Sequence, residues 1–262
     1  MTLGELLAGT FAALAVATVV AAVVPNREVR HRVTTWWGLC GATAIALWLG
    51  EAAVLLLFCG FSLLGLREFP GQKRRAATPI ALAQYVFVYA RWPWAFFAFV
   101  PLAGLAARSF WPLMVCAYGV SFAPGLFLLG ADKRLVFYLL IVVEASDVLQ
   151  YLWGKLLRGP LLAPAITPRK TWSGLIGGVS SATALGTALH AATPFSALQA
   201  AAVCVSITLA GVAGGLVMSA IKRRAGIKDF GTLLPGHGGM LDRLDSLMFA
   251  APVFFFAVRT IA

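Results

Sequence analysis

The chain carries little charge. Only 12% of its 262 residues are Asp, Glu, Lys or Arg, and just ten of these are acidic. Because soluble domains ordinarily contain about 25% charged residues, this composition excludes an ordinary soluble protein. Hydrophobic residues instead make up 60% of the chain, and the mean hydropathy is +0.87. These values predict an all-α, polytopic integral membrane protein.

Cysteine and histidine are also scarce. All four cysteines lie within apolar runs without the spacing of a metal site, so we expect them to be small buried hydrophobic residues. Of the three histidines, His31 and His190 have no motif around them and are expected to be structural. The third, His237, lies in the longest polar stretch of the chain.

Most of the charges that are present are basic, and the formal net charge is +11. Such an excess can indicate a nucleic-acid partner. Here, however, the basic residues fall in short clusters between apolar runs, as the positive-inside rule describes for membrane proteins. The distribution therefore favours a lipid bilayer as partner and argues against nucleic acid.

The apolar runs predict about ten transmembrane helices. The two long runs, 34–66 and 79–107, are each interpreted as two short spans. A single helix of 33 residues would reach ~50 Å across a hydrocarbon core of ~30 Å. The breaks are expected at Gly50-Glu51 and at Arg91-Trp92-Pro93, and treating each run as one span would give eight. The other spans are expected at about 6–24, 112–129, 135–152, 174–192, 196–218 and 246–261.

The basic residues also orient these spans. No basic residue precedes the first span and three follow it, which places the N-terminus outside. With ten spans, 17 of the 21 Lys and Arg residues then face the cytoplasm. Two polar segments, 153–173 and 219–245, are expected on that cytoplasmic side of the cell (inner) membrane, where a soluble nucleotide could reach them.

The segment 219–245 has the spacing of a phosphate site. Pro235 to Gly239 form a turn whose glycines allow close backbone approach and point N–H groups toward an anion. Asp242 and Asp245 follow, three residues apart, so a helix would present both carboxylates on one face to a cation such as Mg²⁺. Basic residues on one side of the turn and carboxylates on the other indicate a metal-assisted phosphate site.

In their order and spacing, these residues resemble the signature of the phosphatidate cytidylyltransferases, also called CDP-diacylglycerol synthases. A second block, Ser146 and Asp147 with 167–174, resembles the other half of the family's active region. The resemblance divides the chain into N-terminal membrane helices at 1–130 and a catalytic membrane region at 131–262. The matching residues of the first block are Ser219, Lys222, Arg223, Lys228, Asp229, Pro235-Gly236-His237-Gly238-Gly239, Asp242, Arg243 and Asp245.

The resemblance implies an activity and a set of site residues. Phosphatidate would attack CTP, giving CDP-diacylglycerol and pyrophosphate for phospholipid biosynthesis, and related enzymes are often homodimers. Mg²⁺, with or without a second cation, is expected on Asp147, Asp229, Asp242 and Asp245, which together with Lys222 are the expected catalytic residues. The expected substrate contacts are Ser146, Lys170, Thr171, Ser219, Arg223, Lys228, Gly236, His237, Gly238, Gly239 and Arg243.

Several of these residues also have plainer explanations. Acids buried near a span end often pair with a cation, residues before a helix often cap it, and basic residues often anchor span ends at the interface. His237 is expected to contact phosphate or orient the backbone, since a phosphate monoester needs little help from a base. The alternatives are Asp147 paired with Lys155 or Lys170, Asp242 paired with Arg243, Asp245 as an N-cap, and Lys170, Lys222 and Arg223 as interfacial anchors.

The chain departs from the family pattern at two places. Ser173 stands where members commonly have Glu, and Gly214-Gly215 stands where they often have Gly-Asp, whose acid joins the metal site. A transferase acting on another lipid phosphate or a polyprenol is therefore one alternative. A non-catalytic lipid-binding or transport protein is another, and magnesium-dependent consumption of CTP would separate it from an enzyme.

Overall fold

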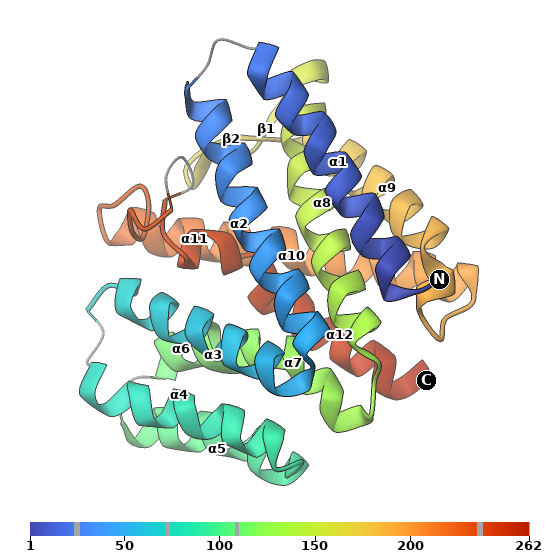
Figure 1. Ribbon diagram of the computed structural model, residues 1–262. Helices are drawn as coiled ribbons and strands as arrows, with labels where there is room; N and C mark the ends of the chain where they lie inside the picture. The colour runs from blue at the N-terminus through green and yellow to red at the C-terminus, as the bar shows by residue number, and fades with distance from the viewer. Residues whose placement is uncertain (24–26, 72–73, 108–109, 235–237, 262) are drawn as a thin grey trace.

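The computed structural model describes residues 1–23, 27–71, 74–107, 110–234 and 238–261, and these are largely helical (Figure 1). The first half contains α1 (Leu3–Val23), α2 (Arg27–Leu49), α3 (Glu51–Glu68), α4 (Arg74–Tyr89), α5 (Pro93–Ala106), α6 (Phe110–Leu113), η1 (Met114–Gly119), α7 (Val120–Gly125) and η2 (Leu126–Leu129). The second half contains α8 (Lys133–Leu157), β1 (Leu161–Ala163), β2 (Thr167–Thr171), α9 (Trp172–Ala188), η3 (His190–Ala192), α10 (Ala197–Arg224), α11 (Leu241–Leu244) and α12 (Leu247–Ile261).

The helix breaks fall where the sequence predicted them. Gly50 separates α2 from α3 with a φ of 112°, a conformation that favours glycine. Arg91, with a φ of 56°, lies between α4 and α5, and Pro93 begins α5. Arg91 also joins the two breaks, because its guanidinium donates to Glu51 Oε2 at 3.0 Å and to the Phe127 carbonyl at 2.7 Å.

The all-α prediction is confirmed, whereas the number of spans stays a prediction. Within the described residues, five helical segments are long and apolar enough to cross a membrane: Leu3–Val23, Phe110–Leu129, Lys133–Leu157, Ala197–Arg224 and Leu241–Ile261. Shorter apolar helices lie at Val33–Leu49, Ala77–Tyr89 and Pro93–Ala106. Two helices also extend beyond the predicted span ends, α8 to Leu157 and α10 to Arg224, so part of each predicted cytoplasmic loop is helical.

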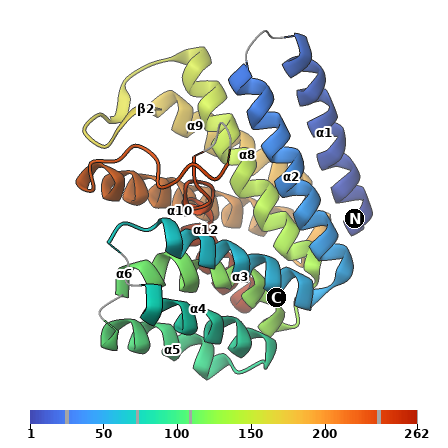
Figure 2. The same cartoon turned by 60° about the vertical axis from the view of Figure 1, so that its left-hand side comes forward.

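Two groups of helices meet at α10 and α12, and a third pair packs on α3 through α2 (Figures 1 and 2). Helices α3 to α7 make one group, α8 and α9 pack along each other, and α1 lies beside α2. One continuous hydrophobic core joins these groups, with fully buried side chains that include Phe58, Phe96, Tyr138 and Phe254. The site described below lies where α8, α10 and α12 approach one another.

Glycines bring α8 and α9 close together. A Cβ at Gly178 would approach the backbone N and Cα of Gln150 to 2.8 Å, and one at Gly174 would overlap the Gln150 carbonyl. Further along α9, Gly186 accepts a hydrogen bond of 2.9 Å from the Tyr138 hydroxyl through its carbonyl. The close crossing fixes the position of α8, which carries Asp147.

A small β-hairpin follows α8 and was not predicted. Strands β1 and β2 pair antiparallel, with Leu161 opposite Thr171 and Ala163 opposite Thr167. The Trp172 amide then donates to the Pro160 carbonyl at 3.1 Å, which ties the start of α9 to the hairpin. The hairpin and the chain between α10 and α11 both lie on the left-hand side of Figures 1 and 2.

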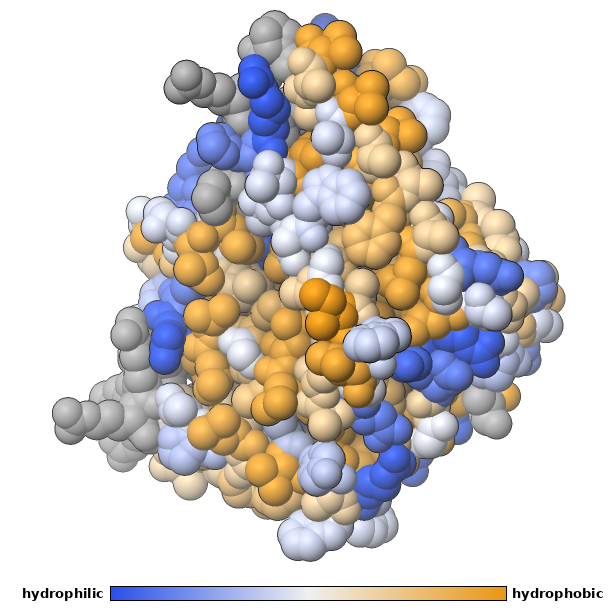
Figure 3. Space-filling model, in the orientation of Figure 1, coloured by the Kyte–Doolittle hydropathy of each residue, from blue (hydrophilic) through white to orange (hydrophobic). Residues whose placement is uncertain are grey.

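The outer surface suits a lipid environment. The face shown in Figure 3 is largely hydrophobic, and hydrophilic residues gather toward its edges. Large apolar side chains are exposed on several helices, among them Trp48, Leu56, Leu102 and Leu198. Burying this apolar surface in a bilayer removes it from water, as expected for a membrane protein.

Replacing Gly178 by Ala is expected to separate α8 from α9, because the new Cβ would overlap the Gln150 backbone, which cannot rotate away. The melting temperature of the purified protein in detergent should fall by several degrees. Gly60→Ala in α3 is the matched control, since a Cβ there has no neighbour within 4 Å among the described residues. Equal melting temperatures for the two variants would contradict the packing assigned to Gly178.

Candidate active site

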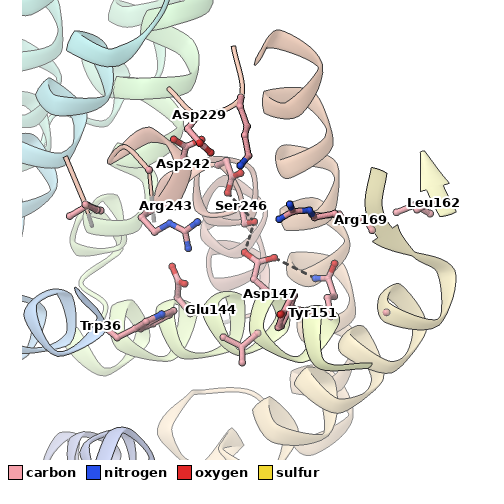
Figure 4. Close-up of a pocket in the computed structure, with 18 of the residues that line it drawn as sticks. Trp36, Glu144, Asp147, Tyr151, Leu162, Arg169, Asp229, Asp242, Arg243 and Ser246 are labelled. Carbon is pink, nitrogen blue, oxygen red and sulfur yellow. Dashed lines mark hydrogen bonds between the residues drawn. The ribbon is translucent and has the colours of Figure 1, made fainter. Parts of the chain in front are cut away.

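A cavity of about 850 Å³ lies between the C-terminal half of α8, the hairpin, and the chain from Lys228 to Ser246 (Figure 4). Besides Asp242, its described lining contains four acidic and four basic residues. Trp36 of α2 and Tyr151 of α8 also border it. The acids are Glu144, Asp147, Asp229 and Asp245, and the bases are Arg169, Lys170, Lys228 and Arg243. Asp242 also borders the cavity, but its carboxylate is engaged by the protein.

Asp147 and Asp245 meet in this cavity, although they are almost a hundred residues apart. The Ser246 hydroxyl donates to Asp147 Oδ2 at 2.7 Å and lies 3.4 Å from Asp245 Oδ1. Gln150, one turn along α8, approaches the other Asp147 oxygen at 3.5 Å (Figure 4). The structure therefore brings together two of the four predicted metal ligands, around a hydroxyl that the sequence did not single out.

Asp242 has a different environment from Asp245. Its Oδ1 accepts from Lys222 Nζ at 2.8 Å, and its Oδ2 accepts from the backbone N–H groups of Phe230 and Gly239, both at 2.9 Å. The side chains of Lys222 and Asp242 are only 11% and 5% exposed. The alternative pairing of Asp242 with Arg243 is therefore not seen, because Asp242 forms a buried ion pair with Lys222, and Lys222 is not among the described residues that line the cavity.

Glu68, at the end of α3, binds the chain where it enters α11. The sequence did not single out this residue. Its two carboxylate oxygens accept from the backbone N–H groups of Met240 at 3.0 Å and Leu241 at 2.8 Å. Gly239 allows this approach, because any Cβ there would overlap the carboxylate. No motif marks Glu68, since its partners are backbone groups more than 170 residues away.

Several cationic side chains at the cavity form no hydrogen bond and no ion pair within 4.0 Å in the described part of the chain. Arg243 Nε is buried without a hydrogen bond, and Figure 4 shows its guanidinium directed toward Glu144 and Asp147. Arg169 approaches from the opposite side, and neither it nor Lys170 or Lys228 forms a side-chain hydrogen bond or ion pair there. Lys170 and Arg243 attract Asp245 through space, yet none of these cations forms a direct bond that an anion would have to replace.

Lys170 lies over Gly215 of α10. A Cβ at Gly215 would be 2.9 Å from Lys170 Nζ and 3.9 Å from both Asp245 Oδ2 and Ser246 Oγ. The ammonium group thus takes the space above the glycine that stands where the family often has an acid. The neighbouring Gly214 is needed for helix packing, because a Cβ there would overlap the Asp245 carbonyl and press on Phe249 of α12.

The remaining predicted residues are placed as follows. Thr171 caps α9, accepting from the Gly174 amide at 3.1 Å, and also lines the cavity. Ser146 is buried and accepts from Gln150 at 3.0 Å, and it is not among the described residues that line the cavity. Asp229 and Gly238 line the cavity, Gly239 is buried, Ser219 lies in the last turns of α10, Arg223 donates to the carbonyls of Ile166 and Ile227, and Gly236 and His237 lie outside the described residues.

Helical spacing could have found part of what was missed. Glu144, Asp147 and Tyr151 are three and four residues apart on α8, and all three line the cavity. Trp36 carried no such signal, because it comes from α2, where the sequence showed only an apolar run.

Two of the alternative explanations, for Asp147 and for Asp245, are not seen in the described residues. Asp147 pairs with neither Lys155 nor Lys170, and Asp245 ends α11 in helical conformation.

The acidic residues do not by themselves enclose a metal ion. Among the residues that the structure describes, no group of three or more His, Cys, Asp or Glu side chains is placed to hold one. Asp147 and Asp245 nevertheless offer hard oxygen donors beside the Ser246 hydroxyl. Such a pair suits Mg²⁺, which proteins commonly hold through one or two carboxylates together with substrate phosphates.

The two aspartates of the 241–245 segment are expected to differ in variants. Asp242→Asn leaves the buried Lys222 ammonium without its counter-ion, which costs about 3–5 kcal/mol, so the melting temperature should fall by many degrees. Asp245→Asn removes one of two neighbouring carboxylates and should leave the melting temperature nearly unchanged. Thermal unfolding of both purified variants in one detergent checks this, and similar shifts would refute the structural role of Asp242.

The sequence also matches a known family. The model of the cytidylyltransferase family matches residues 30–261, nearly the whole chain. The match includes both the hairpin side and the α10–α12 side of the cavity. It confirms the resemblance stated from the motifs.

Individual relatives agree with this match. YnbB of Escherichia coli K12, named an uncharacterized protein, is 34% identical over 97% of both chains. A protein of Brucella abortus named phosphatidate cytidylyltransferase is 41% identical over 55% of this chain and 56% of its own. One of the same name from Bacillus subtilis is 39% identical over 46% of each, so these two alignments span about half of the relatives' length. The chain belongs to the cytidylyltransferase family, whose members are nucleotidyltransferase enzymes.

Proposed function

We propose that the protein is a CTP:phosphatidate cytidylyltransferase, which forms CDP-diacylglycerol and pyrophosphate. One observation carries the proposal. The carboxylates of Asp147 and Asp245 converge on the Ser246 hydroxyl in the same cavity where Arg169, Lys170 and Arg243 form no side-chain hydrogen bond or close ion pair with described residues. Acids for a metal and free cations for phosphate groups are what transfer between two phosphates requires.

The basic residues would bind the phosphate groups of the two substrates. Arg243 and Arg169 approach Asp147 from opposite sides, so phosphates lying between them would meet positive charge on both flanks (Figure 4). Guanidinium groups suit this role because they bind phosphate oxygens with two donors in a fixed geometry. Lys228, at the exposed rim, would add charge where a nucleotide enters.

The carboxylates would hold Mg²⁺ together with the nucleotide. Asp147 and Asp245 are the proposed ligands, with the Ser246 hydroxyl between them, and the exposed Asp229 lies on the same cavity. Asp242 is instead proposed as a structural residue, since both its oxygens are already bonded. When bound, the ion would offset negative charge on the reacting phosphoryl group.

The protein itself would contribute position and electrostatics rather than covalent chemistry. The attacking phosphate of phosphatidate is already an anion near neutral pH, so the cavity needs no strong base. Aligning its oxygen with the α-phosphorus of CTP, opposite the departing pyrophosphate, is the task of the surrounding cations. We place this cavity on the cytoplasmic side of the inner membrane, in a chain with about ten spans.

Another lipid phosphate is the second candidate acceptor. The named phosphatidate cytidylyltransferases align with only about half of this chain, whereas YnbB aligns over 97% of it. In addition, the Lys170 ammonium lies over Gly215, where the family often has an acid. The charge beside the proposed metal ligands therefore differs from the family pattern. A panel of acceptors that contains phosphatidate, other phospholipid monoesters and a polyprenol phosphate would identify the substrate.

Asp245→Asn is expected to abolish transfer while the protein still folds and inserts, because the cavity loses one proposed metal ligand. The measurement is incorporation of radiolabelled CTP into lipid by the purified protein, with and without magnesium. Asp132→Asn is the matched control, since Asp132 caps α8 at its other end and Asn caps helices equally well. Near wild-type transfer by Asp245→Asn would refute the assignment, and magnesium-independent binding of lipid without CTP consumption would favour a scaffold.

A further inference from the structure

The ammonium group of Lys170 stands beside the proposed metal ligands without a bond to any described residue. We propose that Lys170 acts as a permanent second cation of the cavity, so that the site takes one exchangeable divalent ion rather than two. The proposal rests on the proposed function, because it concerns how the same cavity neutralises phosphate charge. It goes beyond the proposed function by stating how many divalent ions the cavity binds and by naming Lys170 as the residue that limits this number.

The position of Lys170 follows from Gly215. The point where a side chain at 215 would begin is 2.9 Å from Lys170 Nζ and 3.9 Å from both Asp245 Oδ2 and Ser246 Oγ. The ammonium therefore lies on the Asp245 side of the cavity. Among the described residues it forms no ion pair within 4.0 Å and no hydrogen bond, and it acts on the Asp245 carboxylate only through longer-range attraction.

The small number of carboxylates available as ligands also supports a single divalent ion. Asp147 and Asp245 share the Ser246 hydroxyl, whereas Asp242 is bonded to Lys222 and two backbone amides. The described residues contain no cluster of three or more metal-ligating side chains. A second divalent ion on the Gly215 side of Asp245 would lie close to the Lys170 ammonium, which like charge disfavours.

The two adjacent glycines of α10 make this arrangement testable. Gly214 is needed for packing, because its Cβ would overlap the Asp245 carbonyl. At Gly215 the nearest neighbour of a Cβ is the end of a flexible lysine, which can move. Substitutions at Gly215 therefore perturb the ammonium group while leaving the crossing of α10 and α12 intact.

Lys170→Met should change the affinities for metal and nucleotide in opposite directions. Removing a positive neighbour should tighten Mn²⁺ binding by about fivefold or more, and losing a phosphate contact should weaken CTP binding by at least about fivefold. Mn²⁺ binding is measured by electron paramagnetic resonance, and CTP binding by calorimetry, in phosphatidylcholine nanodiscs without an acceptor lipid. Lys133→Met, at the other end of α8, is the matched control and should change neither affinity.

Gly215→Asp tests the charge of Lys170 by placing a carboxylate beside it. The new carboxylate would pair with Lys170, so this variant should also bind Mn²⁺ more tightly and CTP more weakly than wild type. The double variant Lys170→Met with Gly215→Asp offers a carboxylate where the ammonium stood. It should bind two Mn²⁺ ions per chain, whereas the wild type should bind one.

Three results would overturn the proposal. These are two Mn²⁺ ions on the wild type, unchanged Mn²⁺ affinity in folded Lys170→Met, and weakened Mn²⁺ affinity in both single variants. A purely structural Lys170 would lower both affinities together with the melting temperature. If no variant or wild type binds CTP, the proposed function fails, while the Mn²⁺ measurements still decide the role of Lys170.

Discussion

The buried ion pair between Lys222 and Asp242 is the interaction on which the cavity depends. It joins the last turn of α10 to α11, and the two backbone amides that also donate to Asp242 fix the chain at Phe230 and Gly239. Because charges are rarely buried without a partner, this set of bonds allows few alternative conformations. Asp245 and Ser246, immediately beyond α11, are therefore directed toward Asp147 of α8.

Glycines set the distances between the helices around this pair. Gly178 lets α9 approach α8, Gly214 lets α12 approach α10, and Gly239 admits the Glu68 carboxylate. At each of these positions a methyl group would overlap a neighbour, so the helices could not come as close. The polar cavity is thus enclosed by close backbone contacts around it, and several of its cationic side chains form no hydrogen bond or close ion pair with described residues.

Much of this arrangement was predictable from the sequence. Hydropathy and helix length gave the all-α membrane fold and the breaks at Gly50 and Arg91, and the motifs gave the family. The different environments of Asp242 and Asp245 were not predictable, because local spacing sets the direction of a side chain but not which distant segment it meets. The same limit applies to Glu68, whose partners are main-chain amides, and to the hairpin, whose strands are very short.

Glu68 and Trp36 have a consequence for how this protein can be divided. The sequence motifs lie in the second half, yet α3 supplies the carboxylate that holds the amides of Met240 and Leu241, and α2 supplies an aromatic wall of the cavity. The two halves are therefore not interchangeable modules. A chimera that joins the second half to the first half of a distant relative would keep every motif residue and still lack part of the cavity.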